Sequence, residues 1–244
     1  MPAAKGTESP SRRLLAVIEE MMETAGRHAE ILGVGVRDLH ARGLTWVLAR
    51  LHVQIGSVPG AGAEVRVATW PAGRQRIFAV RDFQLQNTAG QELLRASSAW
   101  ALMNMETRRP ARLDPHLPVF SRHPERMVAD GFAPLPPPYA QAARASYRAE
   151  AGDIDLNDHV NNTVYLDWAL RSAPPGARSW KPRSLEAAFL GEARLGDTVN
   201  CLTEIGRGER SSVLLQSLRD PASGRELTRL RTRWETGHNP KKTI

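Results

Sequence analysis

The spacing of apolar residues changes from helical to alternating twice along this chain of 244 residues, and this recurrence limits the folds it can adopt. In the first half, apolar residues recur every three or four positions from Leu14 to Leu32, and Gly33 and Gly35 end the run, which predicts one long helix. From Val47 to Ile55 they occupy every second position, as expected for a strand with one buried side. Further strands are predicted at 64–70, 75–86 and 93–103, separated by Pro71-Ala72-Gly73 and Asn87-Thr88-Ala89-Gly90.

The second half repeats this order after a segment rich in proline. Eight of the seventeen prolines lie between Pro110 and Pro138, which disfavours regular structure there and favours an extended connector. The pattern then predicts a strand at 145–149, a helix at about 160–172, and strands at 185–190, 198–205, 212–218 and 226–234.

A helix followed by several strands, twice over, predicts an α+β protein in which an antiparallel sheet wraps each helix. A parallel sheet would instead place a helix between consecutive strands. We therefore expect an N-terminal domain at 11–109, a proline-rich linker at 110–138 and a C-terminal domain at 139–236.

Composition restricts the location and the partners. No run approaches the roughly 18 apolar residues that cross a bilayer, and no apolar signal begins the chain, so we expect a cytoplasmic protein without membrane insertion. The single cysteine, Cys201, excludes an internal disulfide and a multi-cysteine metal site, and we predict that it is buried. A net charge of +7 favours an acidic partner, but no nucleic-acid-binding motif accompanies it, so nucleic acid is not expected.

Seven polar residues crowd into the ten positions from Asp153 to Asn162, immediately before the second predicted helix. The N-terminus of a helix offers unpaired N–H groups and partial positive charge, which stabilise negative charge on a carbonyl oxygen. Acyl transfer or hydrolysis also needs a proton acceptor and a group that orients the reactants. The candidates are Asp155 or His159 as acceptor, Asn157 as orienting group, and the backbone amides of Val160 and Asn161 as oxyanion donors.

A simpler interpretation is that these residues only cap the helix. Asp and Asn are favoured N-cap residues, and most single histidines are structural. Within the following helix, Val164, Tyr165, Trp168 and Ala169 have helical spacing, so we assign them to packing. Composition alone does not decide between capping and catalysis.

The residues around His159 carry a resemblance to a known family. The stretch Asp155-Leu156-Asn157-Asp158-His159-Val160-Asn161-Asn162-Thr163-Val164-Tyr165-Leu166-Asp167-Trp168 resembles the Asp-x-Asn-x-His-Val-Asn-Asn-x-x-Tyr-x-x-Trp motif of acyl-carrier-protein thioesterases. Arg81-Asp82-Phe83 and Arg95-Ala96-Ser97-Ser98-Ala99-Trp100 resemble the same family in the first half. The resemblance implies two tandem hotdog domains, each a long helix wrapped by an antiparallel sheet. It also implies hydrolysis of fatty acyl-acyl carrier protein to a free fatty acid and the carrier thiol.

The resemblance extends to the reacting residues. The catalytic Asp, Asn and His of the family fall on Asp155, Asn157 and His159, and Phe189-Leu190-Gly191-Glu192-Ala193 is similar to the segment with a catalytic Glu followed by Cys. Glu192 takes the place of that Glu, and Ala193 stands where the family has cysteine. We therefore expect Asp155, His159 or Glu192 to activate water without an acyl-cysteine, and we expect neither cofactor nor metal. The first domain is expected to bind the acyl chain and the second to perform the chemistry.

Other functions stay open at this point. A different hotdog enzyme would hydrolyse acyl-coenzyme A or hydrate an enoyl thioester, and a non-enzymatic module would bind acyl groups without turnover. The expected partner is acyl carrier protein, and Arg108, Arg109 and Arg112 are candidates for docking this acidic protein. The length of the acyl chain and the oligomeric state, with a homodimer among the options, do not follow from these residues.

Overall fold

The computed structural model describes residues 9–114, 116–118, 125–139, 142–155, 157–208 and 211–236. Within these ranges nine strands form one antiparallel sheet in the order β2-β3-β4-β1-β6-β9-β8-β7-β5. The first half contains α1 (Pro10–Ile31), α2 (Val36–His40), β1 (Leu44–Ile55), β2 (Val65–Gln75), β3 (Phe78–Asn87) and β4 (Glu92–Asn104). The second half contains β5 (Ala143–Arg148), α3 (Asn162–Arg171), β6 (Lys181–Phe189), β7 (Thr198–Arg207), β8 (Ser211–Arg219) and β9 (Glu226–Glu235), with short 3₁₀ turns at Ala151–Asp153 and Pro175–Ser179.

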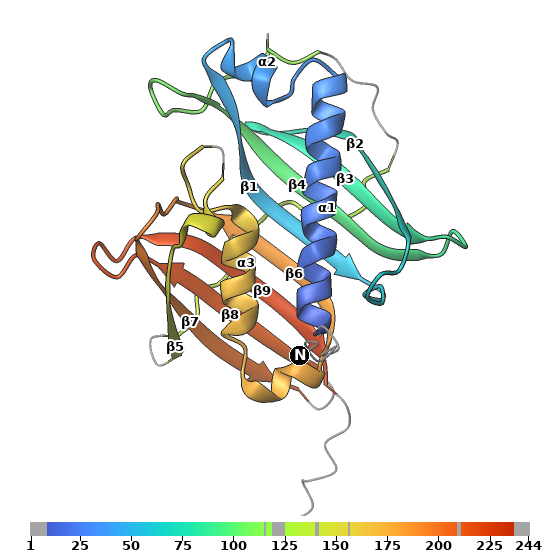
Figure 1. Cartoon of the computed structure of the whole chain (residues 1–244), viewed down its shortest axis with the longest axis vertical. Helices are drawn as coiled ribbons and strands as arrows, with labels where there is room; N and C mark the ends of the chain where they lie inside the picture. Colours follow the sequence, from blue (N-terminus) through green and yellow to red (C-terminus); the bar gives the residue numbers. More distant parts are fainter. Residues whose placement is uncertain are drawn as a thin grey trace, which may run out of the picture.

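The two halves are joined by the pairing of β1 with β6, in which Leu51 lies opposite Ala187. We call this pairing the seam. The strand order is β1-β4-β3-β2 on one side of the seam and β6-β9-β8-β7 on the other, so corresponding strands of the two halves lie equally far from it. β5 adds one further strand beside β7. The predicted repeat of a helix and antiparallel strands is therefore confirmed, and the strands of both halves belong to one continuous sheet (Figure 1).

Both long helices lie on the same face of this sheet (Figure 1). α1 begins where the Ser9 hydroxyl accepts a hydrogen bond from the backbone N–H of Arg12, and it ends before Gly33, whose φ of 68° suits glycine. α3 begins at the N-cap residue Asn161, whose side chain accepts a bond from the N–H of Thr163. Among the described helices, none has the length and apolar character that a membrane-crossing helix needs.

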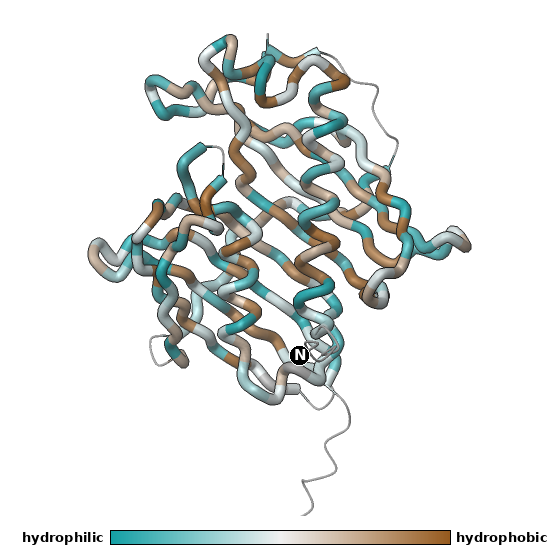
Figure 2. The backbone as a smooth tube through the Cα atoms, viewed as in Figure 1, coloured by the Kyte–Doolittle hydropathy of each residue, from teal (hydrophilic) through white to brown (hydrophobic). Residues whose placement is uncertain are grey.

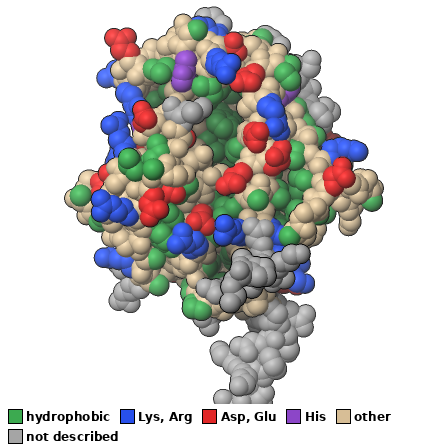
Figure 3. Space-filling model, in the orientation of Figure 1, with side chains coloured by type: hydrophobic (Ala, Val, Ile, Leu, Met, Phe, Trp, Pro, Cys, Tyr) green, Lys and Arg blue, Asp and Glu red, His purple; other side chains and the backbone are tan. Residues whose placement is uncertain are grey.

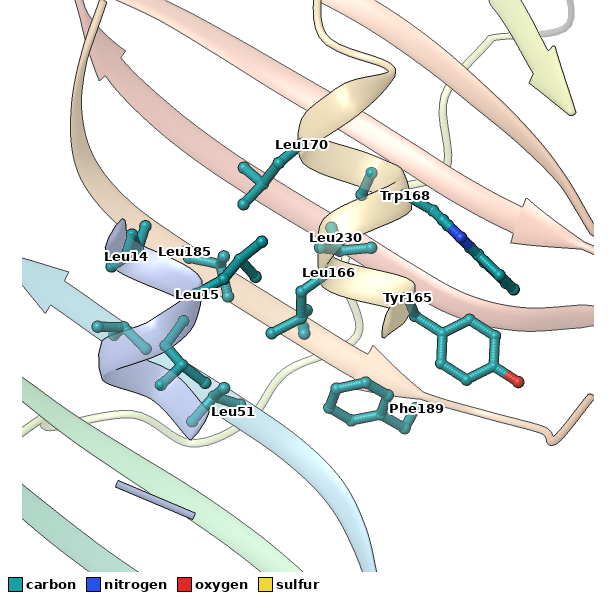
Figure 4. Close-up of a cluster of buried hydrophobic side chains, with 14 of the residues drawn as sticks. Leu14, Leu15, Leu51, Tyr165, Leu166, Trp168, Leu170, Leu185, Phe189 and Leu230 are labelled. Carbon is teal, nitrogen blue, oxygen red and sulfur yellow. The ribbon is translucent and has the colours of Figure 1, made fainter. Parts of the chain in front are cut away.

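The helices are held by one hydrophobic core that spans the seam. Figure 4 shows Leu14 and Leu15 of α1 near Leu166 and Leu170 of α3, together with Leu185 of β6. All five side chains are buried in the same cluster. In Figure 2, hydrophobic and hydrophilic residues alternate along α1, hydrophobic residues are frequent on the central strands, and hydrophilic residues are frequent in the outer hairpin loops. Since burying a side chain of this size contributes about 1.5–3 kcal/mol, this shared core fixes the halves relative to each other.

One predicted turn was wrong. Pro71-Ala72-Gly73 was expected to separate two strands, but it lies within β2, where the pairing with β3 shifts between Pro71 and Gly73. β2 is an edge strand, where proline is tolerated because its missing N–H costs no ladder bond. The actual turn follows Gln75 and contains Arg76 with a φ of 56°.

The predicted linker lacks helices and strands in its described part, but it is not a loose connector. Residues 125–139, here called the strap, are hydrogen-bonded to strands of both halves. The contacts join Met127 N to Asp82 Oδ2 of β3 (2.8 Å), Asp130 Oδ2 to His52 Nδ1 of β1 (2.7 Å), Leu135 O to Arg229 Nη1 of β9 (2.6 Å) and Tyr139 N to Glu204 Oε2 of β7 (2.8 Å). The strap thus crosses the sheet from the first half to the second.

Candidate active site

A cavity of about 1000 Å³ lies between the two halves. Its lining includes residues of α1 and β1 from the first half, and the 155–163 loop and residues 189–192 from the second. In Figure 3 this face of the molecule is hollowed above its centre, with hydrophobic side chains inside the hollow and charged side chains around it. An elongated apolar ligand with a polar reacting group is the kind of molecule that such a lining suits.

The loop before α3 is built by the Asp155 carboxylate. Its Oδ1 atom accepts hydrogen bonds from the backbone N–H of Asn157 at 2.8 Å and of His159 at 3.3 Å. The N–H of Asp155 in turn donates to the carbonyl of His159 at 2.8 Å, and Asp158 adopts a φ of 61° at the tip of the turn. These bonds hold the imidazole of His159 at the cavity wall. Asp155 therefore holds the turn that carries His159, whereas the residue that caps α3 is Asn161.

His159 and Glu192 come together although they are remote in the chain. The Nε2 atom of His159 lies 3.2 Å from Oε2 of Glu192, and the two side chains are 13% and 37% exposed. Asn157 also lines the cavity, and within the described ranges its side-chain amide has no hydrogen-bond partner. Of the residues predicted to react, the structure thus places Asp155, Asn157, His159 and Glu192 on one cavity.

The position of Glu192 is fixed by its neighbour Ala193, which stands where the family has cysteine. The N–H of Ala193 donates to the hydroxyl of Tyr165 at 2.7 Å, and its carbonyl accepts from the N–H of Val160 at 2.9 Å. Burial raises the pKa of Tyr165 to about 12, so this phenol stays protonated at neutral pH. Tyr165 was assigned to packing, and it also anchors the segment that carries Glu192.

Both amides predicted to bind an oxyanion are already engaged. The N–H of Val160 donates to Ala193, as described, and the N–H of Asn161 donates to the carbonyl of Asp153 at 2.8 Å. An amide that gives up such a partner loses a hydrogen bond, so these two groups are poor oxyanion donors in this conformation. Asn162, the first residue of α3, lines the cavity, and its N–H has no partner in the described part of the chain.

The single cysteine lies elsewhere. Cys201 is fully buried in β7 within the hydrophobic core, as predicted, and burial raises the pKa of its thiol. A thiol with a raised pKa is a weak nucleophile at neutral pH. Cys201 also does not line the cavity, so it is not a candidate nucleophile for this site.

Two arginines that were not predicted as site residues contact Glu192. Nη2 of Arg108 donates to its Oε2 at 2.5 Å, and Nη2 of Arg225 donates to its backbone carbonyl at 3.0 Å. Arg108 was predicted as a docking candidate, and it belongs to the turn after β4 in the first half. Only the pairing of the two halves brings it to Glu192, so no local sequence signal indicated this contact.

Another group of potential metal ligands lies beneath the strap. His52, Asp130 and Glu186 offer ligand atoms within 4.8 Å of one another. However, both carboxylate oxygens of Glu186 accept bonds from Arg231, at 2.8 and 2.6 Å, and Asp130 pairs with His52. The charges of this group are therefore largely balanced by protein side chains.

Two helix-on-sheet units joined side by side within one chain place the protein in the double hotdog fold class. The chain belongs to the acyl-ACP thioesterase family. The N-terminal domain of that family matches residues 9–118, and its C-terminal domain matches residues 138–236.

Several curated plant proteins are similar to the chain. A chloroplastic palmitoyl-acyl carrier protein thioesterase of Cuphea hookeriana is 30% identical over 239 residues, covering 89% of this chain and 56% of the relative. The protein of the same name from Arabidopsis thaliana is 30% identical over 251 residues, covering 93% and 60%. The chain thus spans little more than half the length of these relatives.

Solved structures share the fold over nearly the whole chain. The 12:0-ACP thioesterase from Umbellularia californica superimposes with a TM-score of 0.80 at 25% identity, covering 96% of this chain and 92% of that one. An acyl-ACP thioesterase from Bacteroides thetaiotaomicron gives a TM-score of 0.73 at 24% identity, covering 91% and 89%. These likenesses confirm the predicted double hotdog fold.

Proposed function

We propose that this protein hydrolyses fatty acyl thioesters of acyl carrier protein and thereby ends elongation of the acyl chain. The observation that carries this proposal is the His159–Glu192 pair, 3.2 Å apart, on a cavity that both halves line. Membership in the acyl-ACP thioesterase family supports the choice of substrate.

In the proposed reaction, His159 accepts a proton from water as the water oxygen attacks the thioester carbonyl. Glu192 orients the imidazole and stabilises the imidazolium that forms. The side-chain amide of Asn157 and the N–H of Asn162 donate to the oxyanion, in place of the engaged amides of Val160 and Asn161. The tetrahedral intermediate then expels the carrier thiolate, which takes the proton from His159. The products are a free fatty acid and the carrier thiol.

Asp155 has a supporting part in this proposal. Its Oδ1 already accepts two backbone N–H bonds, which reduce its availability as a base. The imidazole of His159 is therefore the better proton acceptor of the two. No step requires a cofactor or a metal ion.

We further propose the division of labour between domains at 11–109 and 139–236, connected through 110–138, with the acyl chain bound mainly by the first. Apolar side chains of α1 and β1, among them Ile18, Met22 and Leu51, line the cavity on that side. The expected cytoplasmic location and a homodimer stay predictions. The curated plant relatives are named as chloroplastic proteins, and fractionation of the source cells would test the location.

The test is product analysis with purified protein and a panel of acyl carrier proteins. We expect release of free thiol and free fatty acid, and we expect His159→Ala to lower kcat by about 100-fold or more, the scale of acid–base assistance. Parallel assays with acyl-coenzyme A and with enoyl thioesters separate this activity from that of other hotdog enzymes. Tight carrier binding without any product would instead identify an acyl-binding module.

A further inference from the structure

We propose that Arg108, from the half assigned to acyl-chain binding, is a positioning residue for the hydrolytic site. It acts through its contact with the carboxylate of Glu192. This inference rests on the proposed function and adds a residue that the motifs around His159 do not contain. With Arg108 included, the proposed catalytic site contains residues from both halves of the chain.

The turn that carries Arg108 is rigidly built. Oδ1 of Asn104 accepts bonds from the N–H of Thr107 at 2.8 Å and from its hydroxyl at 3.0 Å. The N–H of Arg108 donates to the carbonyl of Asn104, and the N–H of Asn104 donates to the carbonyl of Arg109. Arg108 itself has a φ of 56°, a left-handed conformation that costs a non-glycine residue free energy. The turn therefore holds the start of this long side chain in one direction.

Two side-chain nitrogen atoms converge on a single oxygen of Glu192. Nη2 of Arg108 lies 2.5 Å from Oε2, and Nε2 of His159 lies 3.2 Å from the same atom. Arg225 holds the other end of the residue by its bond to the backbone carbonyl. The carboxylate is thus fixed by Arg108 from the first half, and the backbone by Arg225 from the second.

This ion pair is too exposed to contribute much to stability. The side chains of Arg108 and Glu192 are 61% and 37% exposed, and such pairs usually add little to folding. Its consequence is positional, because a half-exposed glutamate without a partner has several rotamers and faces His159 in only some of them.

The clean probe is Arg108→Gly, because glycine adopts a positive φ without strain and keeps the turn. Arg76→Gly is the matched control, since Arg76 is exposed, has the same φ of 56° and lies in the β2–β3 turn outside the cavity lining. We expect Arg108→Gly to lower kcat by about 10- to 100-fold, the scale of misplacing a reacting group, with little change in KM. We expect Arg76→Gly to match the wild type.

Two further measurements separate positioning from a general structural effect. In a Glu192→Gln background, Arg108→Gly should cause no further loss of kcat, because both changes remove the same interaction. Added methylguanidinium should restore part of the activity of Arg108→Gly and none of that of Glu192→Gln. Independent losses in the double variant, or a kcat for Arg108→Gly equal to that of Arg76→Gly, would overturn the inference.

A readout without turnover keeps this inference separate from the proposed function. The ring-nitrogen NMR resonances of His159, assigned with His159→Gln, should move in Arg108→Gly and in Glu192→Gln but not in Arg76→Gly. If the wild type hydrolyses no acyl thioester, the proposed function fails and these resonances still decide the role of Arg108. Unmoved resonances in Arg108→Gly would refute that role.

Discussion

The hydroxyl of Tyr165 in α3 accepts a hydrogen bond of 2.7 Å from the backbone N–H of Ala193. The carbonyl of Ala193 accepts the N–H of Val160, so a single residue ties the loop after β6 to the loop before α3. Glu192 and His159 lie next to these two attachment points. Their 3.2 Å separation therefore depends on a buried phenol that reacts with nothing.

Tyr165→Phe tests this anchor. The pKa of the buried phenol is raised from 10.0 to about 12, so the wild type loses stability as pH rises through this interval, because the unfolded state releases the proton first. The phenylalanine variant should lack that loss and should be less stable at neutral pH by about 1–3 kcal/mol, because the N–H of Ala193 is left unpaired. Urea unfolding at pH 7 and at pH 11 measures both effects. Equal stability of the two proteins at pH 7 would contradict the anchor.

Substitutions of Asp155 can separate two roles of its carboxylate, which are to hold the loop before α3 by hydrogen bonds and to accept a proton in the reaction. Because its Oδ1 accepts the N–H groups of Asn157 and His159, asparagine at this position keeps an acceptor oxygen, and alanine does not. We expect Asp155→Ala to lower kcat by about 100-fold and Asp155→Asn to retain much more of the rate. Steady-state kinetics on acyl carrier protein decide between the roles. An asparagine variant as inactive as the alanine variant would make Asp155 the base.

Helices and strands could be predicted wherever one of their faces is buried, because burial makes apolar residues recur at a regular spacing. The stripe from Leu14 to Ala25 and the alternation in β1 both follow from contact with one core, and so α1 and most strand limits were predicted closely. The exception at Pro71 arose because an edge strand tolerates a residue that normally marks a turn. For residues 125–139 the sequence predicts only a connector, because the polar bonds of the strap to the sheet produce no regular spacing of apolar residues.

The site was predictable only where it is local. The residues from Asp155 to His159 are close in sequence and form one hydrogen-bonded turn, so their density indicated a site. Glu192 was placed by resemblance alone. The contact of Arg108 with Glu192 requires the β1–β6 pairing, and the spacing of residues within either half does not predict which strands of the two halves pair.

The start of α3 depends on Asn161. Its side chain accepts the N–H and the hydroxyl of Thr163, and replacement of such an N-cap by alanine costs about 0.5–2 kcal/mol. We expect Asn161→Ala to lower the free energy of unfolding by this amount. Asn161→Ser should retain most of the wild-type stability, because serine is also a favoured N-cap residue. Because α3 also carries Tyr165, activity should fall in parallel with stability. Denaturant unfolding and thioester assays on both variants provide the measurement, and an unchanged stability in Asn161→Ala would rule out the cap.

The bonds between Asp82 and the strap allow a test of whether the strap stabilises the fold. This carboxylate is 0% exposed, and it accepts bonds from the hydroxyl of Ser97, the side chain of Arg126 and the N–H of Met127. Asp82→Ala removes one partner of a buried ion pair and leaves Arg126 without its carboxylate, a change that typically costs about 3–5 kcal/mol. Asp130→Ala, which breaks the more exposed contact with His52, should cost less. If the strap were a passive connector, Asp130→Ala would unfold at the wild-type urea concentration, and residues 125–139 would be cleaved no faster in Asp82→Ala than in the wild type. A large loss in Asp82→Ala, together with faster proteolysis within 125–139, would instead show that the strap is an integral layer of the sheet.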